Sequence, residues 1–423
     1  MRFLWNMAYQ GFFYLGVYFN AWEGPKTYSL KQLKLNPKDF NARIADVALK
    51  LQKHGYDAYI VGGSIRDLLL RDGVIPKDFD IVTSALPQQI KKCFSRSRII
   101  GKRFRIVHVP VGREVVEVCT FRGATSWLSW CFSDRYRNNI YGSIEQDVWR
   151  RDFSCNALYY DVKNANIVDF TGGVQDIKNK KLAVIGACKA RFKDDPVRML
   201  RAIRFLAKTN FRMDSSCQEE IKRQRRLLRQ VSKDRLLLEL TKLFNQGHAC
   251  ASYKALVDHD YLGTLFSGYE RLGIKLENYQ QFFKSVFHAI DLKYQRNQRL
   301  SSSFLFAALL WPIFDTHLKK LNKKTTYSVK KVVYRVLKFE SRYVAIPGKL
   351  QEAIRDLWML QFLLETKEKP FSEDRYRQPR FQLGYELFCL RAKHNEVLAE
   401  KAMMWQSDFE SANANHSSGK TDE

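Results

Sequence analysis

The spacing of apolar residues divides the chain into two parts of different character. In the first part, short apolar runs typical of strands alternate with segments whose apolar residues recur every three or four positions, as in helices. This alternation predicts an α/β unit. We expect helices at 41–53, 64–70 and 87–94, and strands at 59–61, 77–82, 98–100, 106–109 and 115–121.

The second part, from Asp195 onward, keeps a helical apolar period and has almost no strand-like runs. It is therefore predicted to be helical. Asp195 and Pro196 are suited to the N-cap and first position of a helix in this part. The final residues, 411–423, are polar and are expected to be disordered.

The N-terminus carries an apolar stretch, residues 3–19, that is similar to the hydrophobic region of a signal peptide. Asn6 and Gln10 interrupt it, and no small-residue cleavage site follows. Two interpretations stay open: a targeting segment, or an extension that precedes a start at Met7. No run of about 20 apolar residues could span a membrane, so we expect no membrane partner.

Charge indicates the class of partner. The 423 residues include 71 Lys and Arg but only 44 Asp and Glu, which gives a formal net charge of +27. Such an excess is costly within one fold unless a polyanion shares it, and nucleic acid is the usual polyanion. The alternative is a charge that only serves solubility. The eight cysteines are scattered without a C-x-x-C pair, which fits neither a zinc site nor a dense disulfide framework and suits a reducing cytoplasm.

A pair of aspartates in the first part is the main chemical signal. Asp78 and Asp80 flank Phe79, and alternate residues of a strand point to one face, so the two carboxylates are predicted to lie side by side with Phe79 in the core. Paired carboxylates repel unless cations lie between them, and oxygen ligands suit Mg²⁺. Two such metals can activate a hydroxyl and stabilise a leaving pyrophosphate. Glu117, on another predicted strand, is a candidate third ligand or an ordinary outward-facing residue.

The residues before this pair are suited to phosphate. Gly62 and Gly63 allow backbone N–H groups to approach a triphosphate at a helix N-terminus, and Arg66 adds positive charge there. Further on, Arg151 and Asp152 could bind phosphate and a ribose hydroxyl, or form a surface ion pair of little energetic value.

The helix predicted after Pro196 carries arginines at every third position, Arg198, Arg201 and Arg204, so they cluster on one side. This is either a capped basic helix or a reader of nucleotide bases. In the second case Asp195 accepts a hydrogen bond from an exocyclic amine and Arg198 donates to a ring nitrogen. Adenine and cytosine offer that combination, whereas guanine and uracil do not.

Four motifs in this order carry a resemblance to a known family: GGSIRD at 62–67, DFD at 78–80, RRDF at 150–153 and DDPVRMLRAIRF at 194–205. The chain resembles the class II tRNA nucleotidyltransferase and bacterial poly(A) polymerase family of the DNA polymerase beta-like superfamily. The resemblance covers residues 37–260 strongly and 261–405 more loosely. It implies an α/β nucleotidyltransferase head followed by an all-α neck, body and tail. The implied segments are an extension of unknown role at 1–36, the head at 37–186, the neck at 187–260, the body and tail at 261–410, and a disordered end at 411–423.

Within this family, several segments favour polyadenylation over CCA addition. Residues 100–109 (IGKRFRIVHV) are similar to the poly(A) polymerases, and the glycine-threonine-valine segment typical of CCA-adding enzymes is absent. Residues 139–144, 198–202, 345–347 and 378–381 are similar in the same sense. The expected activity is template-independent transfer of AMP from ATP to RNA 3′ ends, as a mark for decay. CCA addition to tRNA and an idle RNA-binding protein are the alternatives; an appended phosphohydrolase would rest on His259-Asp260 alone.

The resemblance also implies roles for individual residues. Asp78 and Asp80 would hold catalytic Mg²⁺, Asp152 would complete the acidic set, and Asp195 with Arg198 would read the base. Asp194 replaces the family's usual glutamate, and the basic tail common in the family is missing. The implied partners are RNA 3′ ends, ATP and a candidate RNA-degradation complex, in the cytoplasm. The nucleotide-binding set is Gly62, Gly63, Arg66, Arg151, Asp195, Arg198 and Arg201, and the RNA-binding set is Lys222, Arg223, Arg225, Arg226, Lys330 and Lys331.

Overall fold

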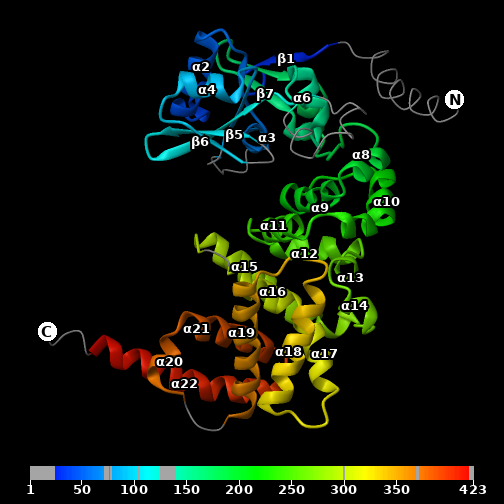
Figure 1. Ribbon diagram of the computed structural model, residues 1–423, viewed down its shortest axis with the longest axis vertical. Helices are drawn as coiled ribbons and strands as arrows, with labels where there is room; N and C mark the ends of the chain where they lie inside the picture. Colours follow the sequence, from blue (N-terminus) through cyan, green and yellow to red (C-terminus); the bar gives the residue numbers. More distant parts are fainter. Residues whose placement is uncertain are drawn as a thin grey trace. The chain divides into compact units, whose positions relative to one another are not determined.

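The computed structural model describes residues 24–418 except 71–75, 77–78, 102–104, 124–139, 299–300 and 368–370, and of residues 373 and 409–418 it describes the backbone only. The chain forms two compact units (Figure 1). The first ends at Cys188 and includes Arg212–Asp214; the second comprises Lys189–Phe211 and the chain from Ser215 onward.

The first unit, the head, is built on a mixed sheet in the order β1-β8-β7-β2-β3-β6-β5-β4. β3 and β6 are parallel, and the other paired strands are antiparallel. The strands are β1 (Lys26–Ser29), β2 (Ala58–Val61), β3 (Asp80–Thr83), β4 (Arg98–Ile100), β5 (Ile106–Val111), β6 (Glu114–Thr120), β7 (Leu158–Asp161) and β8 (Asn166–Asp169). The helices are η1 (Pro37–Asp39), α2 (Ala42–Lys53), α3 (Gly63–Leu70), α4 (Pro87–Cys93), α6 (Ile144–Arg150), η3 (Ser154–Asn156) and α7 (Gly173–Lys178).

Alternation along the strands supplies the two faces of this sheet. Val61 and Val82 pack with Val148 of α6 on one face. Ala58 and Ile60 are buried on the other, where α2 packs against β2. Side chains on alternate sides are expected of strands covered on both faces. The helices predicted at 41–53, 64–70 and 87–94 and the strands predicted at 59–61, 98–100, 106–109 and 115–121 are confirmed to within about two residues. No prediction covered β7, β8, α6 or α7.

Phe79, predicted to turn into the core, is buried and lies 6.3 Å from Phe40, measured between ring centroids. The strand predicted at 77–82 is β3, which begins at Asp80. Asp78 lies outside the described residues. The side-by-side arrangement of Asp78 and Asp80 therefore stays a prediction.

The predicted start of the head at residue 37 is wrong, because β1 pairs with β8 along Lys26–Ser29. This is an edge strand whose side chains are mostly exposed. It has no buried apolar face to give a pattern, and backbone hydrogen bonds to β8 hold it.

The second unit is helical, and its buried residues come from every long helix. Phe314 and Trp358 stack at its centre with ring centroids 4.4 Å apart. Its helices are α8 (Cys188–Asp194), α9 (Val197–Thr209), α10 (Ser215–Gln224), η4 (Arg225–Gln230), α11 (Lys233–Phe244), α12 (Ala249–Asp258), α13 (Leu262–Leu265), α14 (Gly268–Arg271), η5 (Leu276–Tyr279), α15 (Gln280–Gln295), α16 (Ser302–Leu309), α17 (Trp311–Lys319), α18 (Thr326–Glu340), α19 (Gly348–Thr366), α20 (Glu373–Arg377), α21 (Pro379–Ala392) and α22 (Glu396–Ser418).

The predicted disorder from residue 411 is wrong as far as Ser418, because α22 continues to that residue. Extending an existing helix costs far less than nucleating one, and Ala412 and Ala414 favour extension.

The scattered cysteines suited a reducing cytoplasm, but Cys188 and Cys217 form a disulfide bond. Among the described residues, none of the helices is long and apolar enough to cross a bilayer.

Glu340, the last residue of α18, gives the helical unit a pH-dependent stability. Its side chain is completely buried, and its Oε1 accepts a hydrogen bond from the Gly268 N–H at 3.1 Å. Burial raises the pKa of this carboxyl from 4.5 to about 7. Between these two values the folded chain binds more protons than the unfolded chain, so stability falls as pH rises through this range.

We therefore predict that Glu340→Gln stabilises the protein by about 3 kcal/mol above pH 7, since each pKa unit corresponds to roughly 1.4 kcal/mol. The advantage should shrink steadily towards about pH 4.5, where the native carboxyl is protonated in both states. Urea unfolding of both proteins between those pH values measures it. Parallel stability curves would contradict the prediction.

Candidate active site

The turn between β2 and α3 holds Gly62 and Gly63, which the sequence predicts to bind phosphate. Gly62 has a φ of +94°, which side chains rarely adopt, and α3 begins at the next residue. A Cβ atom at position 62 would lie 3.9 Å from Asp80 Oδ2, and one at position 63 would lie 3.2 Å from an Arg66 guanidinium nitrogen. The glycines therefore bring the helix N-terminus close to both a carboxylate and a cation. N–H groups at such a terminus can bind phosphate.

Asp80 and Glu117 occupy neighbouring strands of the same part of the sheet. Asp80 begins β3 opposite Val61, and β3 runs parallel to β6 with Ile81 beside Val118. Asp80 directly precedes Ile81, and Glu117 directly precedes Val118. Both are exposed carboxylates.

The electrostatic surroundings of Cys119 support this arrangement. Burial raises the pKa of the Cys119 thiol to about 11, and the carboxylates of Asp80 and Glu117 add to the rise. The charges of Asp80 and Glu117 therefore both reach the Cys119 thiol, which places the two carboxylates near the same residue of β6. Glu117 Oε1 also lies 3.5 Å from His108 Nε2.

These oxygen donors fit a hard divalent cation. Asp80 is exposed at the start of its strand, next to the Gly62 backbone, and Glu117 is exposed on the adjacent strand. The two carboxylates are of the kind that Mg²⁺ prefers, and the residues present fit the ion. Whether Glu117 is a ligand stays a prediction, as does the role of Asp78.

Arg66 is connected to the RRDF segment through Asn156. The Arg66 side chain is 3% exposed, and its Nε and Nη2 donate to Asp67 Oδ1 at 2.9 and 2.7 Å. Its Nη1 donates to Asn156 Oδ1, and Asn156 Nδ2 lies 3.5 Å from Asp152 Oδ1. The structure thus links the predicted residues Arg66 and Asp152 through Asn156. Sequence reasoning missed Asn156; its position four residues after Asp152 was the only signal.

Asp152 itself is buried and accepts a hydrogen bond from the Phe153 N–H at 2.9 Å. A carboxylate held in this way is suited to fixing neighbouring groups in place. Its predicted membership of the catalytic set stays a prediction.

Arg151 belongs to a second, half-buried polar network. Its Nη2 donates to Asp147 Oδ2 at 2.9 Å and its Nε to the Tyr159 hydroxyl at 2.8 Å. Tyr159 also donates to Asp147 Oδ2 at 2.9 Å. The side chain of Arg151 is 22% exposed and that of Asp147 is 8% exposed. This is not the weak surface ion pair considered from the sequence. Asp147 was missed because no helix was predicted at 144–150, so its i,i+4 spacing from Arg151 carried no signal.

The predicted base-reading residues lie where α8 leads into α9, in the helical unit. Asp195 Oδ2 forms an ion pair with Arg235 at 2.7 Å, and its Oδ1 accepts from the Val197 N–H at 3.3 Å. The helix therefore begins one residue later than predicted, with Pro196 at the cap. Arg198 donates to Asp194 Oδ2 at 3.0 Å. Asp194, which stands where the family usually has glutamate, is thus the ion-pair partner of Arg198.

The other two arginines of this helix share a partner. Arg201 and Arg204 each have a guanidinium nitrogen 4.0 Å from a carboxylate oxygen of Glu239 on α11. Together with Arg235, Glu239 is a residue that sequence reasoning missed, because it comes from a helix distant in sequence.

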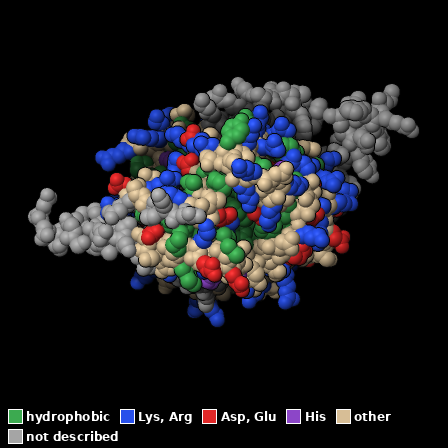
Figure 2. Space-filling view, turned by 90° about the horizontal axis from the view of Figure 1, so that it is seen from below, with side chains coloured by type: hydrophobic (Ala, Val, Ile, Leu, Met, Phe, Trp, Pro, Cys, Tyr) green, Lys and Arg blue, Asp and Glu red, His purple; other side chains and the backbone are tan. Residues whose placement is uncertain are grey.

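The predicted RNA-binding residues occupy two stretches of the helical unit. Lys222, Arg223 and Arg226 are exposed on α10 and η4, while Arg225 pairs with Asp260 at 2.8 Å. Lys330 and Lys331 are exposed on α18. On the face shown in Figure 2, Lys and Arg side chains cover much of the surface.

The His259-Asp260 doublet gains no chemical role. Asp260 is engaged by Arg225, and burial lowers the pKa of His259. In the described part of the chain, no group of three or more His, Cys, Asp and Glu residues could hold a metal ion.

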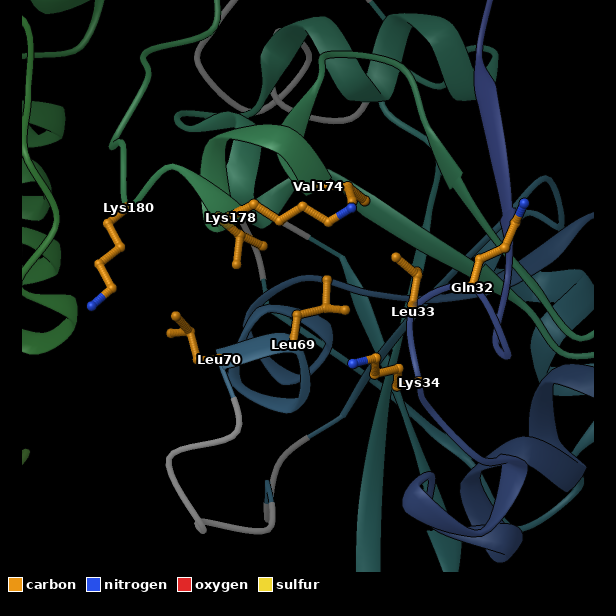
Figure 3. Close-up of a pocket in the computed structure, with 9 residues that line it drawn as sticks. Gln32, Leu33, Lys34, Leu69, Leu70, Val174, Lys178 and Lys180 are labelled. Carbon is orange, nitrogen blue, oxygen red and sulfur yellow. The ribbon is translucent and has the colours of Figure 1, made fainter.

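A pocket of about 410 Å³ lies elsewhere on the head, at the end of α3 distant from Gly63. Figure 3 shows Leu69 and Leu70 of this helix between Lys180 on one side and Lys34 on the other. None of the predicted site residues lines it. Its residues are Gln32, Leu33, Lys34, Leu69, Leu70, Val174, Ile177, Lys178 and Lys180.

Comparison with known proteins decides the family. Over 398 residues, 90% of this chain, it is 34% identical to poly(A) polymerase I of Escherichia coli O6:H1 and covers 84% of that protein. The chain belongs to the poly(A) polymerase I family. Poly(A) polymerase I of Haemophilus influenzae is likewise 34% identical, with 87% of it covered. Residues 58–183 match the family "Poly A polymerase head domain", 210–272 "Probable RNA and SrmB-binding site of polymerase A", and 322–423 "Polymerase A arginine-rich C-terminus".

CCA-adding enzymes are also similar to this member of the poly(A) polymerase I family. A CCA-adding enzyme of Lactobacillus helveticus is 35% identical over 208 residues, 49% of this chain and 51% of that protein. The Bacillus stearothermophilus CCA-adding enzyme in complex with CTP has a TM-score of 0.61 at 22% identity, with 88% of this chain and 82% of that chain covered. The family and the fold expected from the sequence, a nucleotidyltransferase head followed by helical domains, are thereby confirmed.

Proposed function

We propose that this nucleotidyltransferase adds AMP from ATP to RNA 3′ ends without a template. The observation that carries the proposal is the 34% identity to poly(A) polymerase I along 84% of that protein, which includes head and helical parts alike. The CCA-adding enzyme of Staphylococcus haemolyticus is less similar, at 29% identity over 73% of this chain.

The reaction joins the RNA 3′ oxygen to the α-phosphorus of ATP. The hydroxyl loses its proton, the bond from the α-phosphorus to the next phosphate breaks, and pyrophosphate leaves. Asp78 and Asp80, with Glu117 as a further candidate, would hold Mg²⁺, which when bound lowers the pKa of the attacking hydroxyl and stabilises charge on the leaving oxygens. Gly62, Gly63 and the buried Arg66 bind the triphosphate, and Arg66 is held for this by Asp67 and Asn156.

Asp195 and Arg198 are the proposed readers of the incoming base, supported by Arg201. A carboxylate accepts from the exocyclic amine of adenine, and a guanidinium donates to its ring nitrogen. Each mismatched group costs about 1–3 kcal/mol, because it leaves a polar atom unpaired. The ion pairs of Asp195 with Arg235 and of Arg198 with Asp194 support this role, since they limit the rotation of both side chains.

The basic residues of α10, η4 and α18 are proposed to hold the RNA substrate, as the net charge of +27 supports. In the cell this activity would lie in the cytoplasm and mark RNA for a degradation complex. The alternative is CCA addition to tRNA, which uses the same chemistry and differs in the choice of nucleotide and in where addition stops.

The decisive experiment offers each of the four NTPs separately to purified protein with Mg²⁺ and a short RNA with a free 3′ hydroxyl. We expect a long ladder of products with ATP and little extension with the others, on a sequencing gel. tRNA lacking its terminal CCA serves as the second substrate. Incorporation of CTP that halts at a fixed length on this tRNA would contradict polyadenylation and establish CCA addition.

A further inference from the structure

The outer face of α18 carries two tyrosines that the core does not explain. Tyr327 is 68% exposed and Tyr334 is 66% exposed, although both rings are large and apolar. The ammonium group of Lys331 lies 4.4 Å from the ring centroid of Tyr327, and that of Lys338 lies 5.4 Å from the centroid of Tyr334. We call these four residues the tyrosine–lysine stripe. They recur every three or four positions and therefore share one face of the helix.

The opposite face of α18 is an ordinary buried face. It packs against α17 and α19 within the helical unit. The core therefore does not require the residues of the stripe, which form a separate, solvent-exposed surface of the helix. The buried residues of α18 are Val329, Val332, Val333, Val336, Leu337 and Glu340.

Pairs of aromatic rings and cations continue past the end of this helix. Arg271 and Arg342 lie 3.8 and 5.1 Å from the centroid of Phe339. Arg229 of η4 lies 5.7 Å from the centroid of Tyr343. Arg229 is the last residue of the basic run 222–229. This basic run therefore contacts an aromatic ring that follows α18 by three residues.

We propose that the tyrosine–lysine stripe binds single-stranded RNA behind the growing 3′ end, with bases stacked on Tyr327 and Tyr334 and phosphates near Lys331 and Lys338. The inference rests on the proposed function and names its substrate class. Aromatic platforms interleaved with cations are the usual means of holding unpaired strands without sequence preference. The two tyrosines are seven residues apart, about 10 Å along the helix, which suits two to three nucleotides.

The same geometry disfavours a duplex as the ligand. Bases within a duplex already stack on their neighbours, and their faces are not accessible to tyrosine. The stripe thus favours an unpaired tail over a folded tRNA stem. In the free protein each ring contacts a lysine, and this contact at an exposed site is weaker than stacking of a base. RNA can therefore displace the lysines from the rings toward its phosphates.

The test uses the full chain and a labelled oligo(A) of 20 nucleotides in a fluorescence anisotropy titration. Tyr327→Ala with Tyr334→Ala should weaken binding about 10-fold or more, because loss of one stacked base costs roughly fivefold or more and this variant loses two. Tyr327→Phe with Tyr334→Phe keeps both rings and should bind within about twofold of the native protein. A variant pair that loses affinity equally with Ala and with Phe would overturn stacking.

Two further probes separate stacking from charge. Inorganic polyphosphate carries the charge without bases, so its affinity should not change in the double alanine variant. A blunt RNA duplex should be equally insensitive to the loss of the tyrosines. Oligo(A) affinity unchanged by the alanines, in a variant with a native thermal unfolding curve, would overturn the proposal.

The proposed function has its own, separate readout. If the native protein binds oligo(A) through the tyrosines but transfers no AMP, polyadenylation fails and the stripe stands. If it transfers AMP while the alanine variant binds oligo(A) normally, the stripe fails alone.

Discussion

We expect Asp80→Ala to reduce AMP transfer about 10³-fold while the affinity for RNA stays near that of the native protein. The carboxylate begins β3 beside the Gly62 backbone, and carboxylate oxygens are ligands that a divalent cation such as Mg²⁺ prefers. Preorganised groups that stabilise charge in the transition state account for factors of this size when they are removed singly. The residues proposed to bind RNA lie on other elements, so we expect only the chemical step to be impaired. Single-turnover extension of a labelled primer, with anisotropy measured on the same RNA, tests both halves.

The matched control is Asp46→Asn, which alters an exposed carboxylate on α2 of the same unit. It should extend the primer at the native rate. Glu117→Gln, measured alongside, decides whether Glu117 belongs to the metal-binding set: a loss comparable to that of Asp80→Ala includes it, and a native rate leaves it as the neighbour of His108. An Asp80→Ala protein with near-native turnover would disprove the catalytic assignment.

Asp147→Ala should lower the free energy of unfolding by about 3–5 kcal/mol. The substitution removes the acceptor shared by Arg151 and Tyr159. It leaves a largely buried guanidinium without its counterion, and breaking one partner of such a pair costs about this much. The Arg122 N–H, which donates to Asp147 Oδ1 at 3.2 Å, loses its acceptor as well. Urea unfolding followed by circular dichroism gives the value.

Tyr159→Phe is the control for this network, because it removes one hydroxyl and keeps the ring. The lost hydroxyl donates to the Asp147 carboxylate and accepts from the Arg151 guanidinium, and a hydrogen bond to a charged group contributes about 1.5–3 kcal/mol, so we expect a cost of that order. If Asp147→Ala lowers the free energy of unfolding no more than Tyr159→Phe does, the ion pair with Asp147 contributes little to stability. Arg151 would then be better explained by a role in nucleotide binding. ATP affinity of the folded Asp147→Ala protein then tests that role directly.

Local pattern was a reliable guide where burial follows chain order. The strand at 106–109 and the helix at 41–53 were predicted because each buries one apolar face. β1 was missed because an edge strand is held by backbone hydrogen bonds, which leave no trace in the side-chain pattern. The continuation of α22 to Ser418 was missed because polarity was taken as disorder, although the alanines there favour the helix.

By itself, the sequence determined the family, the division into an α/β part and a helical part, and the motifs that carry the chemistry. These depend on residues close together in the chain. Only the tertiary structure decided the partners of those motifs: Asn156 between Arg66 and Asp152, Arg235 on Asp195, and the tyrosine–lysine stripe left outside the core. A hydrogen bond or ion pair needs two groups within a few ångströms. When they come from segments 40 or 90 residues apart, as Arg235 with Asp195 and Arg66 with Asn156 do, folding alone brings them together.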